Sequence, residues 1–332
     1  MKAIAIYAYG GTEVFTEIDA DTPVARPGHV IIDVRATSVN PVDTKIRKGS
    51  EGTAGLKFPA ILHIDVAGII SSVGTGVTRF KVGDEVYGCF GGIVGIPGAL
   101  ADQMEADANM LALKPKILSF GEAASLPLVA ITAWEALVDK ASIQPDDNVL
   151  VHGGTGGVAH IGIQLAKVLG ARVSTTVSNQ KKAAIACRLG ADEIIFYEDE
   201  SPDDYHQRIT KGDGFDVVFD TLGGQVLQDS LRVANLKGHV ISTIGYDTYD
   251  LTDMHFKALR LDIVFMAISI INNVGRAHHG NILERLAALV DRGQIKTLID
   301  SKFEFSLDGV RAAHARLESG NTIGKVIIER SN

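Results

Sequence analysis

The sequence contains very little cysteine. Only Cys89 and Cys187 occur among its 332 residues, and the two do not form a C-x-x-C pair. A disulfide framework or a cysteine-rich zinc site needs more cysteines at closer spacing. Both kinds of structure are therefore excluded.

Long apolar runs and clusters of positive charge are also missing. The longest apolar stretch, Ile263 to Ile271, is interrupted by Ser269 and is much shorter than the ~20 residues of a bilayer-spanning helix. The N-terminus, MKAIAIYAYGG, has one basic residue and an alternating strand pattern, which is typical of neither a secretory nor a transit segment. A net charge of −8 without a basic cluster argues against nucleic acid or anionic lipid as the main partner. We expect a cytoplasmic protein whose partner is a small molecule.

The remaining composition is that of an ordinary globular protein. Hydrophobic residues make up 46% of the chain and charged residues 22%, and 332 residues are enough for two domains. Residues 1 to about 120 are punctuated by Gly and Pro and carry short β patterns, whereas strands alternate with helices from 148 to about 267. We predict an α/β fold with a doubly wound parallel sheet and a second, mainly β domain. The predicted division is 1–122 for the first part of the β domain, 123–267 for the sheet domain and 268–332 for a return to the β domain.

Six strands are predicted in the sheet domain. They are Val149 to His152, Arg172 to Val177, Ile194 to Phe196, Asp216 to Asp220, Val240 to Ile244 and Ile263 to Ala267. A helical run opens at the capping box of Ser119 and Glu122 and continues through Leu137, with a kink expected at Pro127.

A glycine-rich turn lies inside NVLVHGGTGGVAHIGIQLAKVLG, residues 148 to 170. A short apolar strand precedes it, and apolar residues recur at helical spacing after Val158. Gly154, Gly156 and Ala159 have the spacing G-x-G-x-x-G/A, in which the first glycine makes a tight turn and the second admits a pyrophosphate. Free N–H groups at the helix start would hold the phosphates. The pattern predicts a dinucleotide site, although glycine clusters more often mark ordinary turns.

The end of the second predicted strand informs the choice of nucleotide. An NAD site places an Asp or Glu about 20 residues after the glycines, to accept from the ribose 2′-hydroxyl. Here Thr175 to Ser178 occupy that place, and Lys181 and Lys182 follow. We therefore predict NADPH, because no carboxylate would repel a 2′-phosphate. The alternative is that both lysines belong to a solvated helix face.

Several segments together resemble the zinc-free medium-chain dehydrogenases/reductases of the quinone oxidoreductase (zeta-crystallin-like) group. Besides the glycine-rich turn they are VNPVDTKIRKG at 39–49, VGTGVTRFKVGDEVYG at 73–88, AASLPLVAITAWEAL at 123–137 and LGADEIIFY at 189–197. The resemblance implies a GroES-like β domain, a Rossmann domain that binds NADPH, and an active site in the cleft between the domains.

The resemblance also assigns individual residues. The family's pyrophosphate loop matches Thr155, Gly156, Gly157 and Val158, and its 2′-phosphate contacts match Ser178 and Lys182. Tyr197 matches the residue on the adenosine side, Thr132 the group near the nicotinamide amide, and Gly245 the close approach after the fifth strand. Asn40 and Asp43 match positions that line the cleft. The chain departs from the family at Ala159 and near His63, where the family usually has glycine.

The residues available favour chemistry without a metal. Zinc-dependent relatives hold a Lewis acid with Cys and His, but the matching motif here reads Asn40-Pro41-Val42-Asp43. His63 and Cys89 lack a third ligand and are interpreted as pocket wall and core. No tyrosine has a lysine four residues later, which excludes the proton relay of short-chain reductases.

Hydride transfer to an electron-poor acceptor remains. The oxyanion donor could be the Asn40 amide, the Thr132 hydroxyl or the nicotinamide ribose, and Asp43 could be catalytic or could simply bond backbone in its turn. The first hypothesis is an NADPH-dependent quinone reductase. The alternatives are an NADPH-dependent enone or 2-alkenal double-bond reductase and a non-catalytic, crystallin-like protein that binds NADPH.

Three further expectations concern single segments. Ile263 to Ile271 would be an apolar strand at a sheet edge, and pairing with a second copy would cover it, which predicts a homodimer. Residues 272 to 281 are expected to form a mobile loop with His278 and His279 in solvent. His152 is expected to be a satisfied core or cleft histidine.

Overall fold

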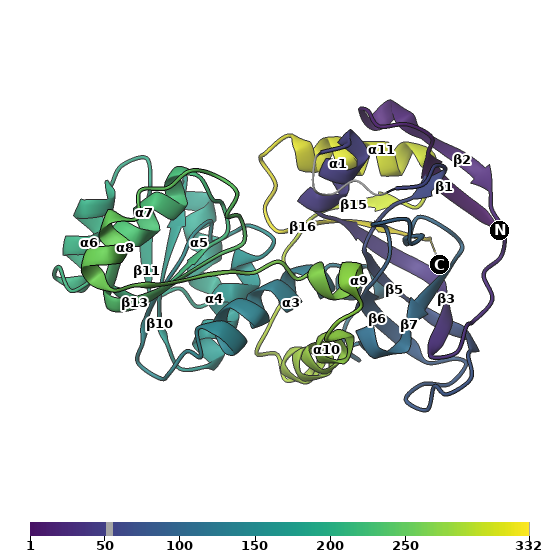
Figure 1. Cartoon of the computed structure of the whole chain (residues 1–332), viewed down its shortest axis with the longest axis horizontal. Coiled ribbons are helices and arrows are strands. Elements are labelled where there is room, and N and C mark those ends of the chain that lie inside the picture. Colours follow the sequence, from purple (N-terminus) through teal and green to yellow (C-terminus); the bar gives the residue numbers. More distant parts are fainter. Residues whose placement is uncertain (51–55, 332) are drawn as a thin grey trace. The chain divides into compact units, whose positions relative to one another are not determined.

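The computed structural model describes residues 1–50 and 56–331. The described residues group by their contacts into two units, which Figure 1 shows with their labelled elements. Unit 1 comprises Met1–Leu128, Ala267–Gly293 and Thr297–Asn332, and unit 2 comprises Val129–Met266 and Gln294–Lys296. Each unit has its own sheets and core.

Unit 1 is mainly β and contains two sheets. The smaller sheet has the order β2 (Phe15–Asp19), β1 (Lys2–Ile6), β4 (Ala60–Ile61). The larger sheet has the order β15 (Ile299–Glu304), β16 (Lys325–Glu329), β3 (His29–Val39), β5 (Asp65–Val73), β6 (Glu85–Cys89), β8 (Leu111–Leu113), with β7 (Gln103–Asp107) also paired to β3. β3 pairs antiparallel with β5, β7 and β16, so strands from both ends of the chain meet in this sheet.

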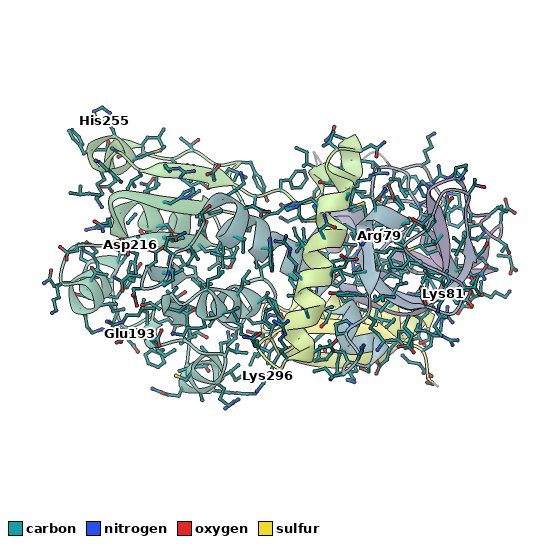
Figure 2. The ribbon with its side chains drawn as sticks, turned by 90° about the horizontal axis from the view of Figure 1, so that it is seen from below. Arg79, Lys81, Glu193, Asp216, His255 and Lys296 are labelled. Carbon is teal, nitrogen blue, oxygen red and sulfur yellow. The ribbon has the colours of Figure 1, made fainter. Side chains whose placement is uncertain are left out.

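Short helices connect and flank these strands. They are η1 (Thr12–Val14), α1 (Pro41–Lys48), η2 (Ala108–Met110), α2 (Phe120–Ala124), α9 (Ile268–Asn272), α10 (Arg276–Asp291) and α11 (Leu307–Glu318). Figure 2 shows Arg79 beside α10, where its guanidinium pairs with Glu284 at 2.6 Å. The buried Tyr87 hydroxyl donates to Leu283 O at 2.6 Å, so β6 and α10 are joined at a second point.

Unit 2 contains one parallel sheet, as predicted. Its order is β11 (Glu193–Phe196), β10 (Arg172–Val177), β9 (Asn148–Val151), β12 (Phe215–Asp220), β13 (Ala234–Ser242), β14 (Arg260–Ile263). The helices are η3 (Glu135–Lys140), α4 (Ala159–Val168), α5 (Gln180–Arg188), α6 (Pro202–Thr210), α7 (Gln225–Val233) and α8 (Thr252–Lys257), and α3 (Pro127–Trp134) begins at the end of unit 1. The order reverses between β9 and β12, which is the switch point where doubly wound sheets bind nucleotides.

Buried aliphatic and aromatic side chains form the core of this sheet. Leu150, Val218 and Val240 come from three neighbouring strands and are all fully buried. Local signals agree with the pattern, since Ser201 caps α6 in a capping box with Asp204. The fold class predicted from alternating strand and helix patterns is confirmed.

The last apolar segment differs from the prediction. The strand ends at Ile263, and Ile268–Asn272 forms the short helix α9. Periodicity alone cannot separate a short apolar strand from a buried helical turn, which explains the error. β14 is nevertheless the last strand in the sheet order, and Ile263 is 43% exposed. The homodimer stays a prediction.

Two other segments also need correction. The expected loop at 272–281 is already helical from Arg276, and His279 is buried, although His278 is exposed as predicted. The helical run opened by Ser119 breaks rather than kinks, because α2 ends at Ala124 and α3 starts at Pro127, which lacks the N–H that a continuing helix needs. Within the described part of the chain, no helix is long and apolar enough to cross a bilayer.

Candidate functional site

The glycine-rich turn lies between β9 and α4, at the carboxyl edge of the parallel sheet. Gly156 N donates to Gly153 O at 2.7 Å, and Gly154 N donates to Thr176 O at 3.0 Å. The left-handed residue of this turn is Gly153, with φ of 74°, which directly precedes the first fingerprint glycine, Gly154. Val158 is the N-cap residue of α4 and provides no side-chain cap, so the positive end of the helix faces the turn and would attract an anion.

The two fingerprint glycines are needed for different reasons. A Cβ at Gly154 would lie 2.3 Å from Thr175 Oγ1, and the buried Thr175 cannot retreat because its hydroxyl donates to Val151 O at 2.6 Å. A Cβ at Gly156 would meet only Gly153 O, at 3.1 Å. Gly154 therefore keeps the turn packed on β10, whereas Gly156 keeps open the space above the turn.

Helix α4 approaches the sheet closely, as the fingerprint requires. A Cβ at Gly162 would lie 3.3 Å from the Phe219 ring. Ala159, which replaces the family's glycine, is fully buried without displacing the helix. The close contact is therefore made one turn later than the fingerprint position.

Residues after β10 present hydroxyl and ammonium groups. Ser178 Oγ accepts from Asn179 Nδ2 at 3.2 Å, and Asn179 Oδ1 caps α5 by accepting from Lys182 N at 3.0 Å. The side chain of Lys181 is exposed and that of Lys182 is half-buried, and no Asp or Glu stands at the end of this strand. The arrangement fits a nucleotide with a 2′-phosphate.

Other predicted cofactor residues lie in unit 2. Tyr197 follows β11 and is 55% exposed. Gly245 follows β13, and a Cβ there would lie 2.6 Å from Ile263 Cδ1, so its small size is also needed for packing against β14. Thr132 is buried on α3. The structure brings the loops after β9, β10, β11 and β13 to one edge of the sheet, because the strands are parallel.

His152 lies at the same edge and is less satisfied than predicted. Its Nδ1 is 3.4 Å from Thr176 Oγ1, but its buried Nε2 has no hydrogen-bond partner among the described residues. Burial lowers the pKa of His152 to about 4, against the opposing effect of Asp220. The ring is therefore neutral at pH 7.

In unit 1, Asn40 and Asp43 form the capping box of α1. Asn40 N donates to Asp43 Oδ2 at 2.7 Å, and both side chains are fully buried. Asp43 Oδ1 has no partner among the described residues. Burial, with a smaller contribution from Asp65, raises the pKa of Asp43 to about 7. The turn role and an acid role are therefore both open to this carboxyl.

Asp65 and Lys325 complete a group that we call the buried polar cluster: Asn40, Asp43, Asp65 and Lys325. Lys325 Nζ donates to Asn40 Oδ1 and lies 3.5 Å from Asp65 Oδ2. Asn40 Nδ2 donates to Asp65 Oδ2 at 2.8 Å. Sequence reasoning missed Lys325 and Asp65. The available signal was that each is a charged residue directly before a run of apolar strand residues.

His63 occupies a left-handed position, with φ of 76°, where the family usually has a glycine nearby. It is buried, and so is Cys89, as predicted. Thr37 donates its one hydroxyl hydrogen to Asp65 O at 2.6 Å, so it accepts from His63 Nδ1 at 3.2 Å. His63 Nε2 then accepts from His314 Nε2 at 2.9 Å, and both rings are neutral. Sequence reasoning did not identify His314.

The side chains that could bind a metal ion are those of histidine, cysteine, aspartate and glutamate. Among residues 1–50 and 56–331, no three such side chains are close enough to hold a metal ion. The polar groups of the buried polar cluster, an amide, an ammonium and a carboxylate, instead contact one another.

Known proteins resemble the chain over nearly its whole length. A family model described as an alcohol dehydrogenase GroES-like domain matches residues 26–116, and one described as a zinc-binding dehydrogenase matches 189–328. The 2-methylene-furan-3-one reductase of Solanum lycopersicum is 35% identical over 99% of this chain and 79% of its own length. The quinone oxidoreductase of Rattus norvegicus is 30% identical over 99% and 97%, respectively. The solved Escherichia coli quinone oxidoreductase complexed with NADPH is 28% identical, with a TM-score of 0.86 over 99% of this chain and 100% of that one.

Proposed function

The chain belongs to the medium-chain dehydrogenase/reductase family, in its zinc-free, quinone oxidoreductase-type group, and on this premise we propose that it is an NADPH-dependent quinone reductase. The family makes it a nicotinamide-dependent oxidoreductase with a GroES-like and a Rossmann-like domain. The finer proposal rests chiefly on the buried polar cluster, whose amide, ammonium and carboxylate groups leave no ligand set for a Lewis acid.

The residues of unit 2 would hold the nucleotide at the switch point. Gly154, Thr155, Gly156, Gly157 and Val158 supply the phosphate turn and the helix start. Ser178 and Lys182 would contact the 2′-phosphate, Tyr197 the adenosine side, and Thr132 and Gly245 the nicotinamide side. When bound, NADPH supplies a hydride to the acceptor.

Two groups of unit 1 are proposed to serve the acceptor oxygen. Asn40 uses one Nδ2 hydrogen on Asp65, which leaves the second for a developing oxyanion. Asp43 keeps a proton near neutrality, since its pKa is about 7, and could replace the proton that reduction consumes. Positioning and a modest acid, without a strong electrophile, suit an acceptor that is already electron-poor.

A comparison of acceptors tests this function. NADPH oxidation should be fastest with a planar ortho-quinone, slower with a 2-alkenal and undetectable with a simple alcohol, and a chelator should change none of these rates. Chelator-sensitive alcohol oxidation would contradict the proposal. NADPH binding without turnover of any acceptor would favour the non-catalytic, crystallin-like role.

Enone reduction is the second candidate function. The Solanum lycopersicum relative, whose name describes a furanone reductase, is 35% identical to this chain, and the Rattus norvegicus quinone oxidoreductase is 30% identical. Enones and quinones both accept a hydride into a conjugated carbonyl, so the same residues could serve either. A 2-alkenal turned over more efficiently than the quinone would select this alternative.

Lys182→Ala is expected to separate the two nicotinamide nucleotides. The ammonium of the half-buried Lys182, at the start of α5, would pair with the 2′-phosphate, which NADH lacks. The KM for NADPH should rise about 10- to 100-fold, in line with a lost charge-assisted bond of about 1.5–3 kcal/mol. The KM for NADH should change less than about twofold. Steady-state kinetics of Lys181→Ala provide the matched control, and equal effects on both nucleotides would refute the NADPH assignment.

We also propose a homodimer that pairs β14 with its copy. β14 is the last strand of the sheet. Ile263, its final residue, is 43% exposed, and Phe265, two residues beyond it, is 47% exposed. Light scattering should give about twice the 35.3 kDa of one chain. Ile263→Lys should shift the protein towards monomer, whereas Leu236→Lys, at another exposed apolar position of unit 2, should not. A wild-type monomer at micromolar concentration would contradict the proposal.

A further inference from the structure

The ammonium of Lys325 is completely enclosed in unit 1. It stands at the first position of β16, where Val326, Ile327 and Ile328 are also buried. Its three hydrogens meet three oxygen atoms, namely Val39 O at 3.3 Å, Asn40 Oδ1, and Asp65 Oδ2 at 3.5 Å. A buried charge is costly unless it is paired and hydrogen-bonded, and here both conditions hold.

Both oxygens of the Asp65 carboxyl accept hydrogen bonds. Its Oδ2 accepts from Ser38 Oγ at 2.7 Å and from Asn40 Nδ2 at 2.8 Å, and its Oδ1 accepts from Leu128 N at 2.8 Å. The ammonium of Lys325 lies 3.5 Å from Oδ2 and adds a positive charge. The carboxyl is therefore an ionised acceptor, the partner that Lys325 requires.

The two charges fix the direction of the Asn40 amide. Its oxygen faces the ammonium and its nitrogen faces the carboxylate. A flipped amide would place its NH2 group against Lys325 and its oxygen against Asp65, and both contacts would be repulsive. Asn40 in turn fixes Asp43 through the 2.7 Å bond from its backbone N–H.

We propose that Lys325 and Asp65 are a positioning pair for the acceptor side of the site: a buried cation and anion that orient the Asn40 amide and act in opposite directions on the carboxyl of Asp43. This inference rests on the proposed function, because it gives Asn40 and Asp43 their roles. Neither member of the pair needs to touch substrate, cofactor or a reacting atom.

The opposite directions follow from the charges that act on Asp43. Lys325 favours the ionised carboxylate and lowers its pKa, whereas Asp65 raises it. Two other titratable groups lie near the cluster. Burial raises the pKa of the Cys89 thiol of β6 well above its ordinary value, and burial together with the charge of Lys325 lowers the pKa of His63 to about 3, so both groups are neutral near pH 7. At the far end of α1, Arg47 and Lys48 pair with Glu318 of α11, at 2.6 and 2.8 Å, and Lys45 lies on the same turn.

The test follows the titration of Asp43 itself. Protein labelled with 13C at aspartate carboxyl carbons is titrated between pH 4 and 9 without nucleotide, and Asp43→Asn assigns the signal. Lys325→Met should raise the pKa of Asp43 by at least about one unit, a tenfold change in proton affinity. Asp65→Asn should lower it. Lys325→Arg keeps the charge and should stay within about half a unit of wild type.

The same variants are then compared in turnover with the quinone. The Kd for NADPH should be unchanged, and kcat should fall about 10-fold or more in Lys325→Met. The limb of the pH–kcat profile that reports Asp43 should move to higher pH in Lys325→Met and to lower pH in Asp65→Asn. Shifts in the same direction, or none, would overturn the proposal. If Lys325→Met does not fold, Asp65→Asn and Lys325→Arg still decide it. The NMR titration needs no turnover, so a protein that reduces no quinone would defeat the proposed function and leave this test intact.

Discussion

Valine in place of Gly156 is expected to raise the Kd for NADPH by at least about 100-fold, or about 3 kcal/mol. Gly156 lies in the turn between β9 and α4, and the corresponding fingerprint glycine lets the pyrophosphate approach the backbone N–H groups. A side chain there would occupy that space. Within the chain its Cβ meets only Gly153 O, at 3.1 Å, and we expect a shift of a few tenths of an ångström to accommodate it. The measurement is titration of NADPH fluorescence, with the melting temperature recorded in parallel.

Gly154→Val provides the contrast. Its Cβ would stand 2.3 Å from Thr175 Oγ1, in the packed contact between turn and strand. We expect this variant to lose both NADPH binding and several degrees of melting temperature, whereas Gly156→Val loses binding only. Wild-type affinity in Gly156→Val would show that the nucleotide does not lie on this turn.

Much of unit 2 could be predicted because its signals are local. The strand, turn and helix of residues 148 to 168 are encoded within a few residues of one another, and a strand run such as Arg172–Val177 matches the structure to the residue. Even there, the sequence did not single out Gly153 as the left-handed residue, since composition does not say which of several glycines takes φ above zero. The apolar run after Ile263 was assigned to one strand because its length and period fit strand and helix equally.

The acceptor side could be predicted only in part. The N-P-V-D motif marked Asn40 and Asp43, and a bond within the turn was among the expectations. Lys325 reaches Asn40 across 285 residues of chain, and His314 reaches His63 across 251. The periodicity of the sequence cannot predict such pairings, because they depend on which strands and helices the folded sheet brings together. His63 illustrates the limit: its place near a family glycine was visible in the sequence, but its hydrogen-bond partners were not.

Acid should weaken unit 1 through the pair of His63 and His314. Burial lowers the pKa of His63 to about 3, helped by the charge of Lys325, and lowers that of His314 well below its ordinary value. An unfolded histidine takes up its proton near pH 6.5, so between pH 6.5 and about 3 the unfolded state binds more protons than the folded state. The free energy of unfolding should therefore fall as the pH falls through this window, by about 5 kcal/mol for His63 alone.

His63→Gly isolates this contribution, since glycine suits the φ of 76° and carries no ring to protonate. Denaturant unfolding of wild type and variant is measured at several pH values from 7 to 4. The free energy of unfolding should fall less steeply with pH in the variant, even if the cavity left by the ring lowers its stability at pH 7. His314→Gln retains a donor towards His63 Nε2 and should keep part of the slope. His255→Ala, at the exposed histidine labelled in Figure 2, should leave the slope as in wild type. If the free energy of unfolding falls equally with pH in His63→Gly and wild type, the buried pair takes up no protons on unfolding. Acid sensitivity would then have to come from carboxylates held as ions in the fold, such as Asp300 beside Arg316.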